Sequence, residues 1–175
     1  MERVAVRARN RGGLKPGDAW RLKSWILSLG EARSVNVRVA PRHIEIDMVA
    51  SKDVVRRLEE ELGPLEPLTG GDPWNLAKSQ RFWEAHEELE EEWRLTKDPG
   101  LEAVIKAMAA LAKAQEGRLD AALRIVSRIP QGLGVDRRCV EEMAARAYQG
   151  LEADILKCIG GARWRDSEGS GRHPT

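Results

Sequence analysis

The sequence predicts an α+β fold, with a small ferredoxin-like β-α-β-β-α domain in residues 1–70 and an all-α four-helix domain in residues 74–160. Two periodicities lead to this prediction. Apolar side chains alternate with polar ones in the first segments, which is the period of half-buried strands. After residue 73 they recur every three or four positions, which is the period of helices. Residues 69–73, Thr-Gly-Gly-Asp-Pro, have the composition of a linker between the two patterns.

The elements expected in the first domain follow the β-α-β-β-α order of a ferredoxin-like fold. The first strand alternates valines and an alanine with arginines, and Gly30 ends the first helix. Pro41-Arg42 predicts a hairpin turn, and Ser51 is a natural cap for the second helix. The expected ranges are strand 3–9, helix 16–29, strands 34–40 and 43–49, helix 51–62 and a short last strand 65–68.

Four helices are expected in the second domain. Helix 101–115 has one apolar face of large side chains and another of alanines, so we expect it to lie at the centre of the domain. Asp136 caps the last helix, whose apolar stripe continues to Cys158. The other two expected helices span 74–96 and 119–129, and residues 161–175 form an expected disordered tail rich in Gly, Ser and Arg.

One segment of the first of these helices, residues 81–94, carries the candidate chemistry. At 100° per residue, His86 falls on the same face as Phe82, Leu89 and Trp93, so its ring is expected to be buried. Glu90 is one turn further on and is expected to accept a hydrogen bond from it. Arg94 follows four residues later and extends the row. The remaining acidic side chains are expected on the opposite, solvated face: Glu84, Glu88, Glu91 and Glu92.

This segment, Phe-x-x-His-Glu-x-Leu-Glu-x-x-Trp-Arg, resembles the signature of the domain of unknown function 309 family. The resemblance continues through the alanine-rich segment 101–115 and the Gly-Arg-x-x-x-Ala segment beginning at Gly117, and it covers roughly residues 74–151. It implies a small all-helical domain. The family has no established activity, so the resemblance implies no reaction.

We predict that His86 and Glu90 form the catalytic or ligand-binding pair of a binding or interaction module, with an undetermined cofactor. Metal-assisted or general-base hydrolysis by the same residues is the alternative. No metal site is predicted, because His-Glu-x-x-Glu lacks the second histidine of the zinc-protease pattern and a third ligand would have to come from elsewhere. A structural role remains open, in which His86 only orients its helix. Further ligand-binding residues are predicted at Glu87, Trp93, Arg94 and Lys106, although Lys106 could instead pair with Glu102 on its own helix.

Nucleic-acid binding is a further alternative, although not the favoured one. Residues 1–42 carry ten Lys and Arg against three acidic residues, and arginines could line one face of the sheet. The strands, however, contain no Phe or Tyr of the kind that RNA-recognition motifs use for stacking. The alternative is a solvated strand face. The arginines are Arg3, Arg7, Arg9, Arg11, Arg38 and Arg42.

Cys139 and Cys158 are 19 residues apart, which on one helix is roughly 28 Å and too far for a disulfide. Free thiols, the lack of a long apolar run and the lack of a signal-peptide core predict a cytoplasmic protein with no membrane segment. High charge content with few Asn and Gln points to a thermophile. The two-sided apolar helix and the tryptophans predict a two-fold homodimer, with Trp20, Trp25 or Trp74 at its interface.

Overall fold

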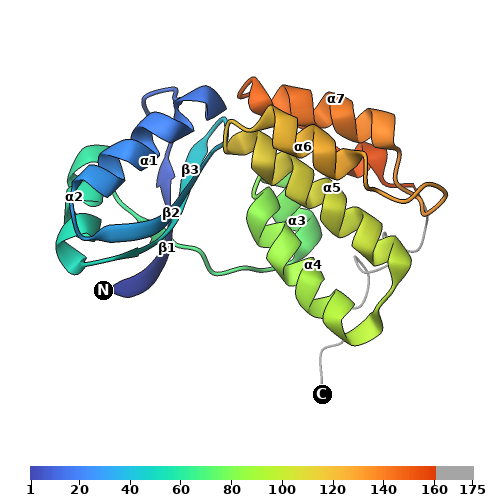
Figure 1. The fold of residues 1–175 in the computed structure, drawn as a ribbon, viewed down its shortest axis with the longest axis horizontal. Helices are drawn as coiled ribbons and strands as arrows, with labels where there is room; N and C mark the ends of the chain where they lie inside the picture. Colours follow the sequence, from blue (N-terminus) through green and yellow to red (C-terminus); the bar gives the residue numbers. More distant parts are fainter. Residues whose placement is uncertain (161–175) are drawn as a thin grey trace, which may run out of the picture.

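The computed structural model describes residues 1–160 and arranges them around two separate hydrophobic cores (Figure 1). One core lies between a β-sheet and two helices, and the other lies within a group of helices. The tail expected at residues 161–175 lies outside the described residues. Within residues 1–160, no helix combines the length and the apolar character needed to cross a membrane.

The N-terminal part contains a four-stranded antiparallel sheet in the order β2-β3-β1-β4. Ser51 caps helix α2 as expected, since its side chain accepts a hydrogen bond from the Val54 backbone N–H at 3.4 Å. A short 3₁₀ turn, Pro16–Asp18, precedes helix α1. The elements of this part are β1 (Glu2–Arg9), α1 (Ala19–Ser28), β2 (Ala32–Val39), β3 (His43–Ala50), α2 (Lys52–Leu62) and β4 (Glu66–Pro67).

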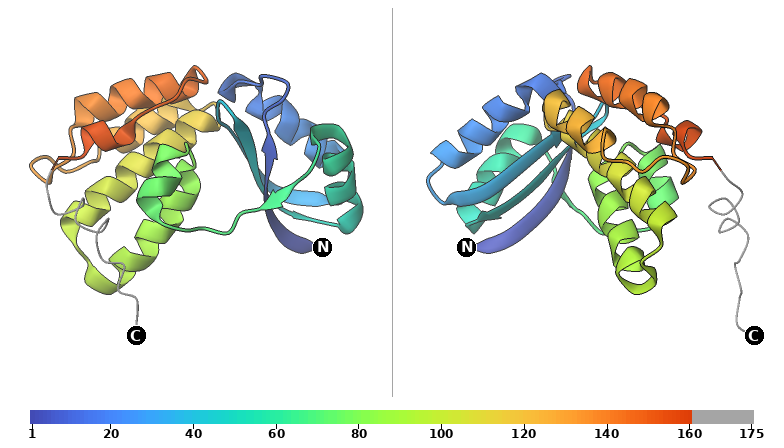
Figure 2. Two further views of the ribbon diagram at one scale, coloured as in Figure 1. Left: turned by 180° about the vertical axis from the view of Figure 1, so that it is seen from behind. Right: turned by 45° about the vertical axis from the view of Figure 1, so that its right-hand side comes forward.

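The two faces of this sheet have opposite character because side chains alternate along each strand. Val6 of β1 lies opposite Ile46 of β3, and both are buried in the core beneath α1 and α2. One residue further along β1, Arg7 lies opposite Glu45 on the other face, and Arg38 of β2 also lies opposite Glu45. The helical part of the chain lies on the side of this second, charged face (Figure 2).

Up to residue 160, the C-terminal part contains five α-helices, one more than expected. The long first helix is interrupted at Gln80, whose φ of +62° places it in the left-handed region. The interruption is held by the side chain of Gln80, which donates to the Ala153 carbonyl at 3.0 Å and accepts from its N–H at 2.8 Å. The elements are α3 (Pro73–Lys78), α4 (Phe82–Thr96), α5 (Pro99–Gln115), α6 (Leu119–Val126), α7 (Arg137–Tyr148) and the 3₁₀ turn η2 (Ile155–Cys158).

Helix α5 occupies the centre of the second core, as its two apolar faces predict. Both the alanine face and the face of larger side chains are buried, and α4, α6 and α7 all pack against it. The expectation that a second copy of the chain must cover α5 was therefore wrong, because helices of the same chain bury both of its faces. The expected homodimer stays a prediction, and it now depends on Trp20 of α1, which is 62% exposed.

The prediction of free cysteines was also wrong, since Cys139 and Cys158 form a disulfide. The last helix does not continue to Cys158. It ends at Tyr148, and Gly150, at φ +74°, turns the chain back. The returning segment pairs with the start of α7, where the Asp136 N–H donates to the Cys158 carbonyl at 2.9 Å. The two cysteines thus meet at the same end of the helix. Free thiols therefore no longer support the prediction of a cytoplasmic protein.

The two parts of the molecule meet through charged and aromatic side chains. Arg38 of β2 is only 2% exposed and lies against Trp83 of α4, with its guanidinium carbon 4.2 Å from the indole centroid. Its Nε atom is 3.3 Å from a carboxylate oxygen of Glu116, just after α5. Arg38 is therefore not part of a solvated strand face, whereas Arg3, Arg9, Arg11 and Arg42 are exposed.

Candidate functional site

Helix α4 presents the candidate residues along the edge where it leaves its core. Phe82 and Leu89 are fully buried against the rest of the helical part, as expected. His86 lies at the margin of this core rather than inside it, and its side chain is 16% exposed. The ring is therefore largely shielded, but one edge of it is accessible to solvent and solutes.

The ring of His86 is positioned by an aromatic neighbour. It stacks on Trp83 with the ring centroids 5.2 Å apart and the planes inclined by 15°. The Nδ1 atom is shielded from solvent and lies 3.3 Å from Glu87 Oε1, without the geometry of a hydrogen bond. The expected hydrogen bond to Glu90 is not formed, because Glu90 pairs instead with Arg94 at 3.4 Å.

Three side chains of α4 nevertheless bring possible metal ligands together. His86, Glu87 and Glu90 each offer one nitrogen or oxygen atom, and these atoms lie within 4.8 Å of one another. Glu87 was expected only to bind a ligand, and the third metal ligand was sought elsewhere in the chain. The structure brings a third possible ligand from the next residue, because Glu87 Oε1 lies 3.3 Å from His86 Nδ1.

A cavity of about 170 Å³ adjoins this cluster, between the sheet and α4. Trp83 and Glu87 line it from the helix, and Arg3 and Asp47 line it from the sheet. Arg3 donates to Asp47 at 3.2 Å, and this hydrogen bond is the main reason that the pKa of Arg3 is raised. The lining also includes Glu84 and Glu88, so acidic side chains outnumber the single arginine and favour a cation.

The other predicted ligand-binding residues have separate roles. Trp93 is half-buried beneath the ammonium group of Lys97, which lies 4.1 Å from its ring centroid. Lys106 pairs with Glu102 on its own helix at 2.8 Å, which is the alternative that the spacing left open. Arg94 is exposed and reaches the site only through Glu90.

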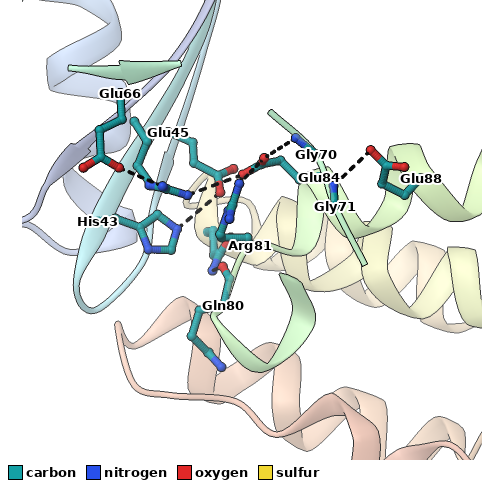
Figure 3. Close-up of polar contacts among 11 residues, drawn as sticks. His43, Glu45, Glu66, Gly70, Gly71, Gln80, Arg81, Glu84 and Glu88 are labelled. Carbon is teal, nitrogen blue, oxygen red and sulfur yellow. Dashed lines mark hydrogen bonds and ion pairs between the residues drawn. The ribbon is translucent and has the colours of Figure 1, made fainter. Parts of the chain in front are cut away.

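A buried cluster of charges next to this site was not predicted from the sequence. Glu84 was expected on the solvated face of its helix, but it is 4% exposed because Arg81, the linker at Gly70 and Arg7 surround it. It accepts hydrogen bonds from Arg81 and from the Gly70 backbone N–H (Figure 3). Arg7 of β1 lies 3.9 Å away. The polar face of β1 could have indicated a charged partner, but only the packing of sheet on helix identifies it.

Comparison with known proteins confirms the family resemblance for part of the chain. Residues 73–125, from the start of α3 into α6, match the model of the family described as Domain of unknown function (DUF309). This segment contains the whole of α4 and therefore His86, Glu87 and Glu90. No curated protein and no solved structure matches the chain.

Proposed function

We propose that this protein is a binding module that takes a divalent transition-metal ion at His86, Glu87 and Glu90. The observation that carries the proposal is the approach of three ligand atoms to within 4.8 Å of one another on a single helix. The shielded Nδ1 atom of His86, which has no hydrogen-bond partner, supports it. A nitrogen ligand bound to a cation would satisfy an atom that is otherwise costly to bury.

The donor set suggests which ion would be preferred. One imidazole and two carboxylates suit Zn²⁺ and its neighbours better than Mg²⁺ or Ca²⁺, which favour sites built from oxygen alone. Three protein ligands would leave a fourth position for water or for a group of a partner molecule. Glu87 is about half exposed, which keeps that position accessible.

The surroundings favour a binding role over a purely structural one. If His86 were enclosed in a filled core, an interaction protein without a ligand-binding site would be favoured. The cavity beside the cluster favours a ligand-binding site instead. Glu87 belongs to both the ligand cluster and the cavity lining, so a molecule in the cavity could reach the ion. Metal-assisted hydrolysis is the corresponding second candidate, with the ion lowering the pKa of a bound water.

We further propose that the chain folds as two domains. The strand order, with β1 between β3 and β4, and the two α-helices on one face support a ferredoxin-like domain in residues 1–70. The separate cores support a second, helical domain in residues 74–160. The metal site would lie in the second domain and face the first.

Titration of the metal-free protein with Zn²⁺ in a calorimeter tests the proposal. We expect one high-affinity site per chain, with much weaker binding of Mg²⁺ and Ca²⁺. His86→Ala and Glu87→Gln should each abolish the high-affinity site, whereas Glu91→Gln, an exposed change on the same helix, should leave it intact. Circular dichroism would show that each variant is folded. Equal Zn²⁺ binding by the wild type and both ligand variants, or no binding at all, would exclude the site.

A further inference from the structure

We propose that a second site, a basic groove between the sheet and the helical part, binds the phosphate groups of an anionic ligand. The groove consists of two cavities of about 420 and 350 Å³. They adjoin, because Arg7, Arg42 and His43 line both. The larger cavity reaches toward the end of α2, and the smaller one reaches the turn between α3 and α4. Each lies within the usual size range of small-molecule sites.

The charge of the lining is strongly one-sided. Six Lys and Arg side chains line the groove, against two acidic ones, Glu66 and Glu152. With histidine neutral, the lining therefore has an excess of four positive charges. The buried Glu84 behind the groove reduces this excess only to three. The chain as a whole has a formal charge of +1, so the positive charge is concentrated here rather than spread over the molecule. The six cationic lining residues are Arg7, Arg9, Arg11, Arg42, Lys78 and Arg81.

Two of these cations are held in place before any ligand arrives. Arg7 lies between Glu66, at 2.8 Å, and Glu84, at 3.9 Å. Arg81 shares the same Glu84 carboxylate, which accepts bonds from its Nε and a terminal nitrogen. The buried Glu84 thus positions two guanidinium groups, and together with Glu66 it balances their charges, so the excess positive charge of the groove comes from the other cations. Such a pair is suited to phosphate, which accepts several charge-assisted hydrogen bonds.

The side chains of Arg9, Arg11 and Arg42 can move to contact the ligand. Arg42 pairs with Glu152 at 2.7 Å, but both side chains are exposed, and exposed pairs of this kind contribute little. A phosphate can therefore replace Glu152 at small cost. Within residues 1–160, no carboxylate lies at ion-pair distance from Arg9 or Arg11. His43 is oriented between these groups by Glu45, whose carboxylate oxygen is 3.2 Å from its Nε2 atom.

The lining also indicates what the groove does not recognise. Neither cavity is lined by Phe, Tyr or Trp. Without an aromatic platform, bases of a nucleic acid would not be stacked, and recognition would be confined to phosphate. A small polyphosphate and the backbone of a nucleic acid both supply this group. The site shares Arg7, Arg9, Arg11 and Arg42 with the strand arginines considered from the sequence, and the helical part adds Lys78 and Arg81 to them.

Binding of two probes to the full-length protein tests the proposal: inorganic tripolyphosphate by calorimetry, and a labelled oligothymidylate by fluorescence anisotropy. Arg42→Glu should weaken binding by about tenfold at low salt. It should also reduce the slope of log affinity against log salt concentration by the amount expected for roughly one phosphate contact. Arg9→Glu should act in the same direction. Arg128→Glu is the matched control, because it makes the same charge change at an exposed residue that lines neither cavity.

The outcomes separate the sources of phosphate. Tight, groove-dependent binding of tripolyphosphate alone supports a small phosphorylated ligand, and tighter binding of the oligothymidylate supports a nucleic-acid backbone. An equal loss of affinity in Arg42→Glu and Arg128→Glu would mean that only net charge matters and would overturn the site. Absence of binding of both probes at low salt would do the same. Melting curves of the three variants verify that each is folded.

Discussion

The guanidinium of Arg38 lies over the indole of Trp83, at 4.2 Å from its centroid, and Trp83 in turn stacks on His86 at 5.2 Å. This series of planar groups connects strand β2 to the candidate metal site on α4. The imidazole is therefore positioned by the packing of the sheet against the helices, as well as by its own helix. A change in that packing is expected to reach the ligand cluster through Trp83.

Trp83→Ala is expected to lower the free energy of unfolding by about 2 kcal/mol, because a half-buried indole and its contacts with Arg38 and His86 are lost. Leu95→Ala, on the same helix, is the control. Leu95 is 85% exposed, so its removal should change stability by no more than about 0.5 kcal/mol. Urea denaturation of the two variants measures the difference. Similar losses for both would contradict the role assigned to Trp83.

Removal of the disulfide should lower the free energy of unfolding by about 3 kcal/mol, the cost expected for a loop of this size. The bond joins residues 19 positions apart and fixes the segment after α7 to the start of that helix. Thermal melts of Cys139→Ser and of the wild type, each with and without reductant, test this. Reductant should affect only the wild type. A thiol assay that detects two free cysteines in the native, unreduced protein would contradict the disulfide itself.

Gly117→Ala should destabilise the protein by at least about 1 kcal/mol more than Gly132→Ala. Both glycines have a positive φ, +75° and +77°, so both substitutions bear a similar backbone cost. Only at Gly117 would the added methyl group meet another segment, 2.5 Å from the Pro16 carbonyl oxygen. The difference between the two variants therefore isolates the close contact of the α5–α6 turn with the first part of the chain. Equal melting temperatures would show that this contact can relax.

Glu66 is expected to titrate below its ordinary value of 4.5, because the hydrogen bond from Arg7 and the charge of Arg7 lower its pKa. The ionised form is thus favoured by folding. Its contribution to stability is present above the unfolded pKa and is lost as the pH falls through the folded pKa. Carboxyl chemical shifts followed by NMR measure the titration. Arg7→Met should return Glu66 toward 4.5 and leave Asp120, whose pKa is lowered by Ala121 and Arg124, unchanged.

Much of the fold follows from local patterns. The alternation of valines with arginines was sufficient to predict the strands, because a sheet with one buried face requires this period. The two apolar sides of residues 101–115 likewise predicted a central helix, since both faces must leave water. The Phe-x-x-His-Glu motif predicted a helix where α4 lies and indicated the family whose model matches residues 73–125. Such features depend on neighbours in the sequence, which is why they can be recognised without a structure.

The tertiary structure decided the features that depend on distant partners. Cys158 meets Cys139 only because Gly150 turns the chain back along α7. Glu84 is buried only because Arg7 of β1 and the linker at Gly70 lie against its side of α4, where a helical wheel of the isolated segment predicted solvent. The convergence of Glu87 with His86 and Glu90 depends on side-chain conformations, which residue spacing does not specify. Periodicity determines which face of an element is apolar, but only packing determines what lies against each face.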